Sequence, residues 1–281
     1  MDFSVFKDRL VASGYSDDTA YAKIAHDIVL KAVRDSGFHD NLTVKGGVVM
    51  SSLTDTARRA TMDMDLDFLR YPLANDAIRK FVSGLNRVAP CRIRISGKIE
   101  TLRQQEYKGK RIHLTLIDEV GASIETKVDI GVHARTEVEQ SDRSFKIVVD
   151  DSEVSLLVNP NEQIFVEKLK SLLRFGSAST RFKDIFDMYY LSSRTRRDVV
   201  GKLLKAYIFD DSGMRENTIP DVLARLGRVF RNKAFMRSLS KPINAWLDVP
   251  AEKATSGIIA FISSFKAAHS HIETKESNSG G

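Results

Sequence analysis

The sequence predicts an α+β protein in which a mixed, mostly antiparallel sheet forms an N-terminal domain and an all-helical domain follows it. Three observations carry this prediction. Apolar residues have helical spacing before residue 40, alternate in a β-like pattern between Arg92 and Val149, and return to helical spacing from Pro160 to about residue 268. The β-rich region thus precedes the helical region along the chain.

Length and composition fit this architecture. The 281 residues are 42% hydrophobic and 28% charged, which is the balance of a soluble globular protein with one large domain or two ordinary ones. No apolar run reaches the roughly 18 to 20 residues of a membrane span, so we expect a cytoplasmic chain without a membrane partner. The single Cys91 excludes an internal disulfide and is expected in a buried strand. Domains are expected at 1–155 and 156–272, with a disordered polar tail at 273–281.

The first predicted helix spans residues 17–37. Its apolar residues recur at helical spacing, Ser16 is a suitable N-terminal cap, and Gly37 is a suitable stop. A short strand is expected at 42–44. Gly46-Gly47 breaks this strand before another helix starts, which predicts a strand, a glycine turn and a helix in succession.

The later elements follow the same two patterns. Residues 62–68 alternate as a strand, and Asn75–Val88 has helical spacing. Further strands are expected at 92–95, 112–117 and 123–130. A turn is expected at Lys108-Gly109-Lys110, and interruptions of the helical domain near 176–180 and 210–213.

The strand at 62–68 carries acids on one face. Successive side chains of a strand point to opposite faces, so Asp63, Asp65 and Asp67 share one face at intervals of about 6.5 to 7 Å. Like charges there destabilise a sheet unless a cation compensates, and carboxylates on a rigid element are the ligands that Mg²⁺ or Mn²⁺ takes alongside phosphates. The alternative is an exposed edge strand with solubilising acids. An EF-hand loop is excluded, because Phe68 stands where glycine is needed and Ala74 where glutamate is needed.

A metal site for phosphoryl transfer usually needs a further carboxylate from a neighbouring strand, and Asp129 fits that position. Gly46-Gly47 would let backbone N–H groups approach a phosphate at a helix N-terminus. No Walker loop, Gly-x-Gly-x-x-Gly turn or Gly-x-Ser-x-Gly elbow occurs, and the six histidines lack metal-ligand spacing. The segment from Glu167 to Lys205 holds ten basic residues against four acids, which fits either a solvated helix face or a nucleic-acid surface.

Four sequence blocks, taken in order, resemble the AbiEii/AbiGii family of toxin nucleotidyltransferases, which includes the MenT toxins. The blocks are Lys45-Gly46-Gly47, Arg59 to Phe68, Glu167-Lys168-Leu169 and Arg181 to Leu191. The resemblance covers about residues 40 to 192. It implies a polymerase β-like nucleotidyltransferase fold joined to a helical domain, acting in a toxin–antitoxin or phage abortive infection system.

In characterised members of that family a nucleotide is transferred from an NTP to the 3′ end of tRNA, which blocks translation. The implied partners are therefore NTP, tRNA and an antitoxin from a neighbouring gene, a DNA-binding repressor without stable direct binding to the toxin. The implied metal ligands are Asp63, Asp65 and Asp129. The implied catalytic residues add Lys168 and an aspartate of the block Lys183–Asp187, with Asp184 and Asp187 left open. The implied nucleotide-binding residues are Lys45, Gly46, Gly47, Arg59, Thr61, Arg181 and Lys183.

Two positions depart from the wider superfamily. Gly46-Gly47 stands where a Gly-Ser pair is usual, so backbone rather than a hydroxyl would hold phosphate. Asp67 occupies a position that is often not acidic. Thr61 stands two residues before the first metal aspartate, where some relatives are silenced by phosphorylation.

Three other functions stay open: nucleotide transfer to a protein or small molecule, an NTP-dependent kinase, and a non-catalytic nucleic-acid-binding module.

Overall fold

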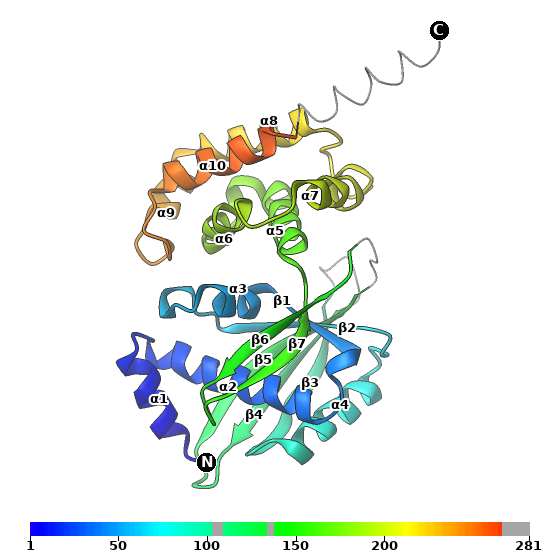
Figure 1. Cartoon of the computed structure of the whole chain (residues 1–281), viewed down its shortest axis with the longest axis vertical. Coiled ribbons are helices and arrows are strands. Elements are labelled where there is room, and N and C mark those ends of the chain that lie inside the picture. Colours follow the sequence, from blue (N-terminus) through cyan, green and yellow to red (C-terminus); the bar gives the residue numbers. More distant parts are fainter. Residues whose placement is uncertain (103–108, 134–137, 266–281) are drawn as a thin grey trace. The chain divides into compact units, whose positions relative to one another are not determined.

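The computed structural model of the chain describes residues 1–102, 109–133 and 138–265 (Figure 1). The chain divides into two compact units, Met1–Asn159 and Pro160–Gly281. The expected domain boundary at residue 155 lies inside the last strand of the first unit, β7. The expected disordered tail at 273–281 lies outside the described residues.

The described part of the first unit contains a seven-stranded mixed sheet with the order β3-β4-β5-β2-β1-β7-β6. The strands are β1 (Leu42–Lys45), β2 (Asp63–Phe68), β3 (Arg92–Leu102), β4 (Gly109–Ile117), β5 (Ser123–Val132), β6 (Ser141–Ile147) and β7 (Ser152–Val158). Among the described strand pairs, only β1–β7 and β2–β5 are parallel, so the prediction of a mixed, mostly antiparallel sheet is confirmed.

Two local predictions in the sheet are wrong. Gly109 and Lys110, expected in a turn, begin β4, and Lys108 lies outside the described residues. Cys91, expected in a buried strand, is only partly buried and stands just before β3. β3 begins at Arg92, as predicted, so Cys91 lies one residue outside the strand.

Four α-helices accompany the described sheet. They are α1 (Phe3–Ala12), α2 (Asp17–Asp35), α3 (Gly46–Thr54) and α4 (Asn75–Val88). The predicted N-cap of α2 is confirmed, because the Ser16 side chain accepts a hydrogen bond from the Thr19 N–H. The apolar face of β2 is buried, and Phe68 makes an edge-to-face contact with Phe81 of α4. The packed face of β2 is therefore the one opposite its aspartates.

The described residues of the second unit form helices joined by loops, without a strand. Its elements are α5 (Asn161–Phe175), η3 (Gly176–Ala178), α6 (Phe182–Ser192), α7 (Arg197–Leu204), a π-helical turn η4 (Lys205–Phe209), α8 (Ile219–Phe230), α9 (Lys233–Leu239) and α10 (Ala251–Ser263). Phe165 and Phe261 pack edge to face in its core at 5.0 Å between ring centroids. Among the described helices, none is both long and apolar enough to cross a membrane.

Candidate functional site

Four charged residues form one row across adjacent strands of the sheet. Asp65 in β2 is paired in register with Lys45 of β1 on one side and with Asp129 of β5 on the other. Asp129 is in turn paired with Arg111 of β4. Because residues in register lie opposite each other on neighbouring strands, the structure brings the two aspartates together from segments 64 residues apart in sequence (129 − 65).

The carboxylates on this face are bound to cationic side chains. Arg111 donates two hydrogen bonds to Asp129, at 2.7 and 2.8 Å, and this contact raises the pKa of Arg111. Lys127 Nζ lies 2.6 Å from Asp63 Oδ1. Within the described residues, no group of three or more His, Cys, Asp or Glu side chains is arranged to hold a metal ion. Cationic side chains therefore balance the charges of Asp63 and Asp129 in this structure.

The donor set nevertheless fits a hard divalent cation. Asp65 and Asp129 supply carboxylate oxygens from two adjacent strands, and Asp63 lies on the same face of β2. Arg111 and Lys127 supply positive charge at the carboxylates where a cation would bind. A metal ion would have to compete with these two side chains for the oxygens of Asp129 and Asp63.

Asp67 differs from the other aspartates of β2. It is only 6% exposed, and Lys45 Nζ lies 2.9 Å from its Oδ1. A Cβ atom at Gly131, its partner in β5, would overlap the Asp67 carboxylate. Asp67 thus occupies the space that glycine leaves on the neighbouring strand, and it orients Lys45.

The glycine pair at the start of α3 makes room for two side chains of the site. Gly46 has φ +67°, and a Cβ there would lie 2.5 Å from Asp65 Oδ2. A Cβ at Gly47 would lie 2.5 Å from Thr61 Oγ1. The N-terminus of α3 therefore approaches the carboxylate of Asp65 closely, which places its backbone N–H groups beside the acidic row.

The segment before β2 holds two further predicted residues in different environments. Thr61 is partly exposed, and its hydroxyl donates a 3.3 Å hydrogen bond to the Asp63 carbonyl oxygen. Arg59, predicted to bind nucleotide, is only 4% exposed. Thr61 therefore stands at the start of the acidic strand, whereas Arg59 is part of the buried interior.

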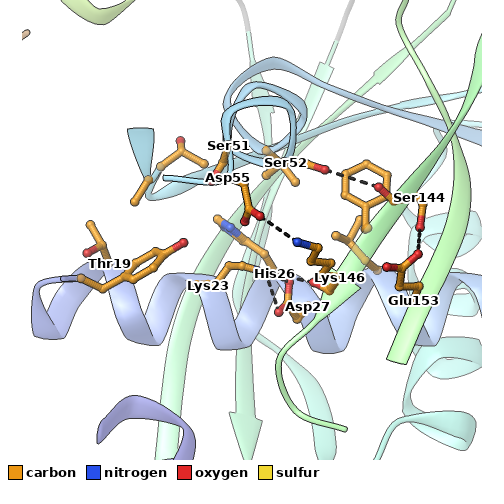
Figure 2. Close-up of a pocket in the computed structure, with 16 residues that line it drawn as sticks. Thr19, Lys23, His26, Asp27, Ser51, Ser52, Asp55, Ser144, Lys146 and Glu153 are labelled. Carbon is orange, nitrogen blue, oxygen red and sulfur yellow. Dashed lines mark hydrogen bonds and ion pairs between the residues drawn. The ribbon is translucent and has the colours of Figure 1, made fainter. Parts of the chain in front are cut away.

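A cavity of about 210 Å³ lies beside Thr61, between α2, α3 and β6 (Figure 2). Burial lowers the pKa of His26, which lines it, to about 4, and the imidazole hydrogen-bonds the backbone of Met62 just before β2. Asp27 is also buried; it pairs with Lys23 at 2.6 Å and accepts a hydrogen bond from the Val148 N–H. The cavity is lined by none of the three predicted metal ligands.

The predicted residues of the second unit form their own cluster between α5 and α6. Lys168 Nζ contacts the carboxylate of Asp184 and lies 2.9 Å from Asp187 Oδ2. The side chain of Asp187 is completely buried. Arg181 is exposed just before α6, and Lys183 is partly exposed in its first turn. Both aspartates that the sequence left open thus bind the same ammonium group.

The sequence did not indicate three residues that complete these contacts. Lys127 precedes Asp129 by two positions, and this strand spacing could have placed it on the acidic face. Arg111 and Gly131 carry no local signal, because their importance depends on the strand pairing of β4 with β5 and of β5 with β2.

Comparison with known proteins identifies the family. No curated protein matches the chain. The sequence profile described as nucleotidyl transferase AbiEii toxin, type IV toxin–antitoxin system, matches residues 28–253. This range includes the acidic row, the glycine turn and the Lys168 cluster. The chain therefore belongs to the AbiEii family of nucleotidyl transferase toxins.

Proposed function

We propose that this toxin transfers a nucleotide from an NTP to the 3′ end of tRNA and thereby blocks translation. One observation carries the proposal: Asp65 and Asp129 lie in register on adjacent strands, with Asp65 against the Gly46 turn at the start of α3. This combination of paired carboxylates and a helix N-terminus supports a polymerase β-like nucleotidyltransferase unit.

In the proposed reaction the RNA 3′-hydroxyl attacks the α-phosphate of the NTP in line, and pyrophosphate leaves. Asp63, Asp65 and Asp129 would hold Mg²⁺ or Mn²⁺, which when bound would neutralise phosphate charge and lower the pKa of the hydroxyl. The N–H groups at Gly46 and Gly47 would orient the triphosphate. Arg111 and Lys127 hold the carboxylates of Asp129 and Asp63 in orientation.

The predicted residues of the helical unit would have two roles: to bind phosphate and to stabilise the helical unit itself. Arg181 is exposed and would contact phosphate directly, whereas Lys168 is held by two carboxylates. Lys183 would add positive charge beside Arg181. An antitoxin of the DNA-binding repressor type would act without stable contact with the toxin.

The test is incubation of the purified chain with total RNA and each α-labelled NTP in turn. We expect label in the tRNA band, with Mg²⁺ required. Asp65→Asn should abolish transfer, because it removes one carboxylate charge from the row. The matched control is Asp142→Asn, which changes an exposed aspartate of β6 and should leave transfer intact.

Parallel reactions separate the other activities. Incorporation of label from γ-labelled ATP would identify a kinase, because only a kinase transfers the terminal phosphate. Label in a protein band or a small molecule, with none in RNA, would identify a different acceptor. RNA binding without any transfer, unchanged by Asp65→Asn and by Mg²⁺, would identify a non-catalytic binding module.

A further inference from the structure

The helical unit contains a pocket lined by arginines. The pocket has a volume of about 440 Å³ and lies between the end of α5, the loop before α8 and one face of α8. Four arginines line it, namely Arg174, Arg215, Arg225 and Arg228. The acidic side chains in its lining are Glu216 and Asp221, so these six residues carry a net charge of +2 (4 − 2).

Among the described residues, the two exposed arginines of this arginine pocket, Arg215 and Arg228, are not paired with its acidic side chains. Asp221 accepts hydrogen bonds from the Thr218 hydroxyl at 2.7 Å and the Asn217 N–H at 3.3 Å, and the Thr218 contact lowers the pKa of Asp221. It therefore serves the N-terminal turn of α8. Arg215 and Arg228 form no ion pair within the described part of the chain. Both guanidinium groups are available to an external anion.

The arginine pocket is also held in shape. Arg225 donates a 3.1 Å hydrogen bond to the Leu173 carbonyl oxygen, and Arg228 follows three residues later on the same helix. The loop that carries Arg215 is fixed to α5, because Lys170 Nζ lies 2.5 Å from Asp211 Oδ2 and Asp211 accepts a hydrogen bond from the Gly213 N–H. Arg225 and the loop that carries Arg215 are therefore fixed in place, which reduces the conformational entropy lost when an anion binds.

Several basic residues between Glu167 and Lys205 are paired with acids and are not part of the arginine pocket. Lys168, Lys170 and Lys205 all pair with aspartates of the same unit. Of the ten basic residues between Glu167 and Lys205, Arg174 is the one that lines the arginine pocket. These three lysines therefore neutralise local acids, and the two exposed arginines of the pocket, Arg215 and Arg228, lie outside that run.

We propose that the arginine pocket binds a backbone phosphate of the acceptor RNA. Guanidinium forks match phosphate oxygens in pairs, and an unbalanced arginine cluster favours a polyanion. The alternative anion, the NTP triphosphate, already has the glycine turn beside Asp65 in the first unit. The identity of the RNA as tRNA rests on the proposed function.

The test measures binding of deacylated tRNA to the full chain without NTP, in the Asp65→Asn background, over a range of salt concentrations. Arg215→Gln combined with Arg228→Gln should raise the Kd at least about tenfold and reduce the salt slope by about one, because one phosphate contact is lost. The matched control is Lys233→Gln with Arg237→Gln, two exposed residues of α9 outside the pocket. It should change neither quantity.

Three outcomes would overturn the proposal, given that thermal unfolding shows the variants folded. The pocket variant could bind tRNA as tightly as the α9 control, or the parent protein could fail to bind tRNA at all. In the active background, a raised KM for NTP with an unchanged Kd for tRNA would assign the pocket to the triphosphate. A chain that transfers no nucleotide can still be tested for tRNA binding. The proposed function and the proposed phosphate site can therefore fail independently of each other.

Discussion

Arg111 and Lys127 stand at the carboxylates where a divalent cation would bind, and each holds a different aspartate of the acidic face. Aspartates crowded on one strand face repel, and the side-chain cations relieve that repulsion without a metal ion. The strand is thereby stable as a folded element, and its charges are already ordered. At the scale of single residues, ion pairs hold the carboxylates of Asp63, Asp67 and Asp129 on this face.

Substitution of Gly131 tests how the Asp67 carboxylate packs against β5. Gly131→Ala should lower the free energy of unfolding by about 1–3 kcal/mol, because the new Cβ meets the buried Asp67 carboxylate, whose Cγ would lie at 3.3 Å. Thermal unfolding measures the change. As a control, Gly201→Ala in α7 meets only the Phe265 ring at 3.9 Å and should be neutral or stabilising by up to about 1 kcal/mol. Equal melting temperatures for Gly131→Ala and the wild type would refute the packing role.

At the scale of elements, His26 connects α2 to the segment just before β2. Its pKa is lowered from 6.5 to about 4 by burial, so the unfolded chain binds more protons than the folded chain between these values. The stability contributed by neutral His26 is present above pH 6.5 and is lost as pH falls toward 4. Asp27 acts in the opposite direction, because burial raises its pKa and protonation then favours the folded state.

Replacement of His26 isolates its share of this pH dependence. Between pH 7.5 and pH 5, the wild type should lose about 2 kcal/mol of unfolding free energy more than His26→Gln, since the variant lacks the titrating group. Urea unfolding at both pH values measures the difference, and the contribution of Asp27 cancels in the comparison. An equal loss in both proteins would contradict the assignment.

The Lys168 cluster joins α5 to α6, so its loss should be visible in stability. Lys168→Met would leave two carboxylates facing each other, one of them completely buried, and should destabilise the helical unit by about 3–5 kcal/mol. Asp187→Asn should cost more than Asp184→Asn for the same reason of burial. Thermal unfolding monitored by circular dichroism measures all three variants.

The thermal stability of Lys168→Met decides how a loss of nucleotide transfer in this variant is interpreted. If Lys168→Met melts early, loss of nucleotide transfer follows from the loss of structure. If it melts like the wild type and still loses transfer, the structural account is wrong and Lys168 acts on the substrate directly.

At the scale of the whole molecule, local patterns predicted much of the fold. Helical spacing with the Ser16 cap predicted α2, and the glycine pair predicted the turn between β1 and α3. The acidic face of β2 followed from strand alternation alone. Such features depend on neighbours in the sequence, so the sequence reveals them.

Long-range pairing explains what local patterns leave undetermined. The sequence indicated Asp129 as a carboxylate from a neighbouring strand but not its register. Asp129 lies opposite Asp65 only because β2 and β5 pair in parallel and in register. Arg111 reaches the site through a second pairing, and the arginine pocket joins residues from α5, a loop and α8. Ion pairs such as Lys170–Asp211 likewise neutralise basic side chains that a count of charges along the sequence treats as available to a ligand.

Binding of Mn²⁺ in the presence of a non-hydrolysable NTP, measured by electron paramagnetic resonance, tests the central claim most directly. Asp65→Asn and Asp129→Asn should weaken binding by at least about tenfold, whereas the surface control Asp142→Asn should bind as the wild type does. Asp67→Asn should keep Mn²⁺ binding and lose stability, because Asp67 pairs with Lys45 in a buried position. Wild-type affinity for Mn²⁺ in a folded Asp65→Asn variant would contradict the metal site.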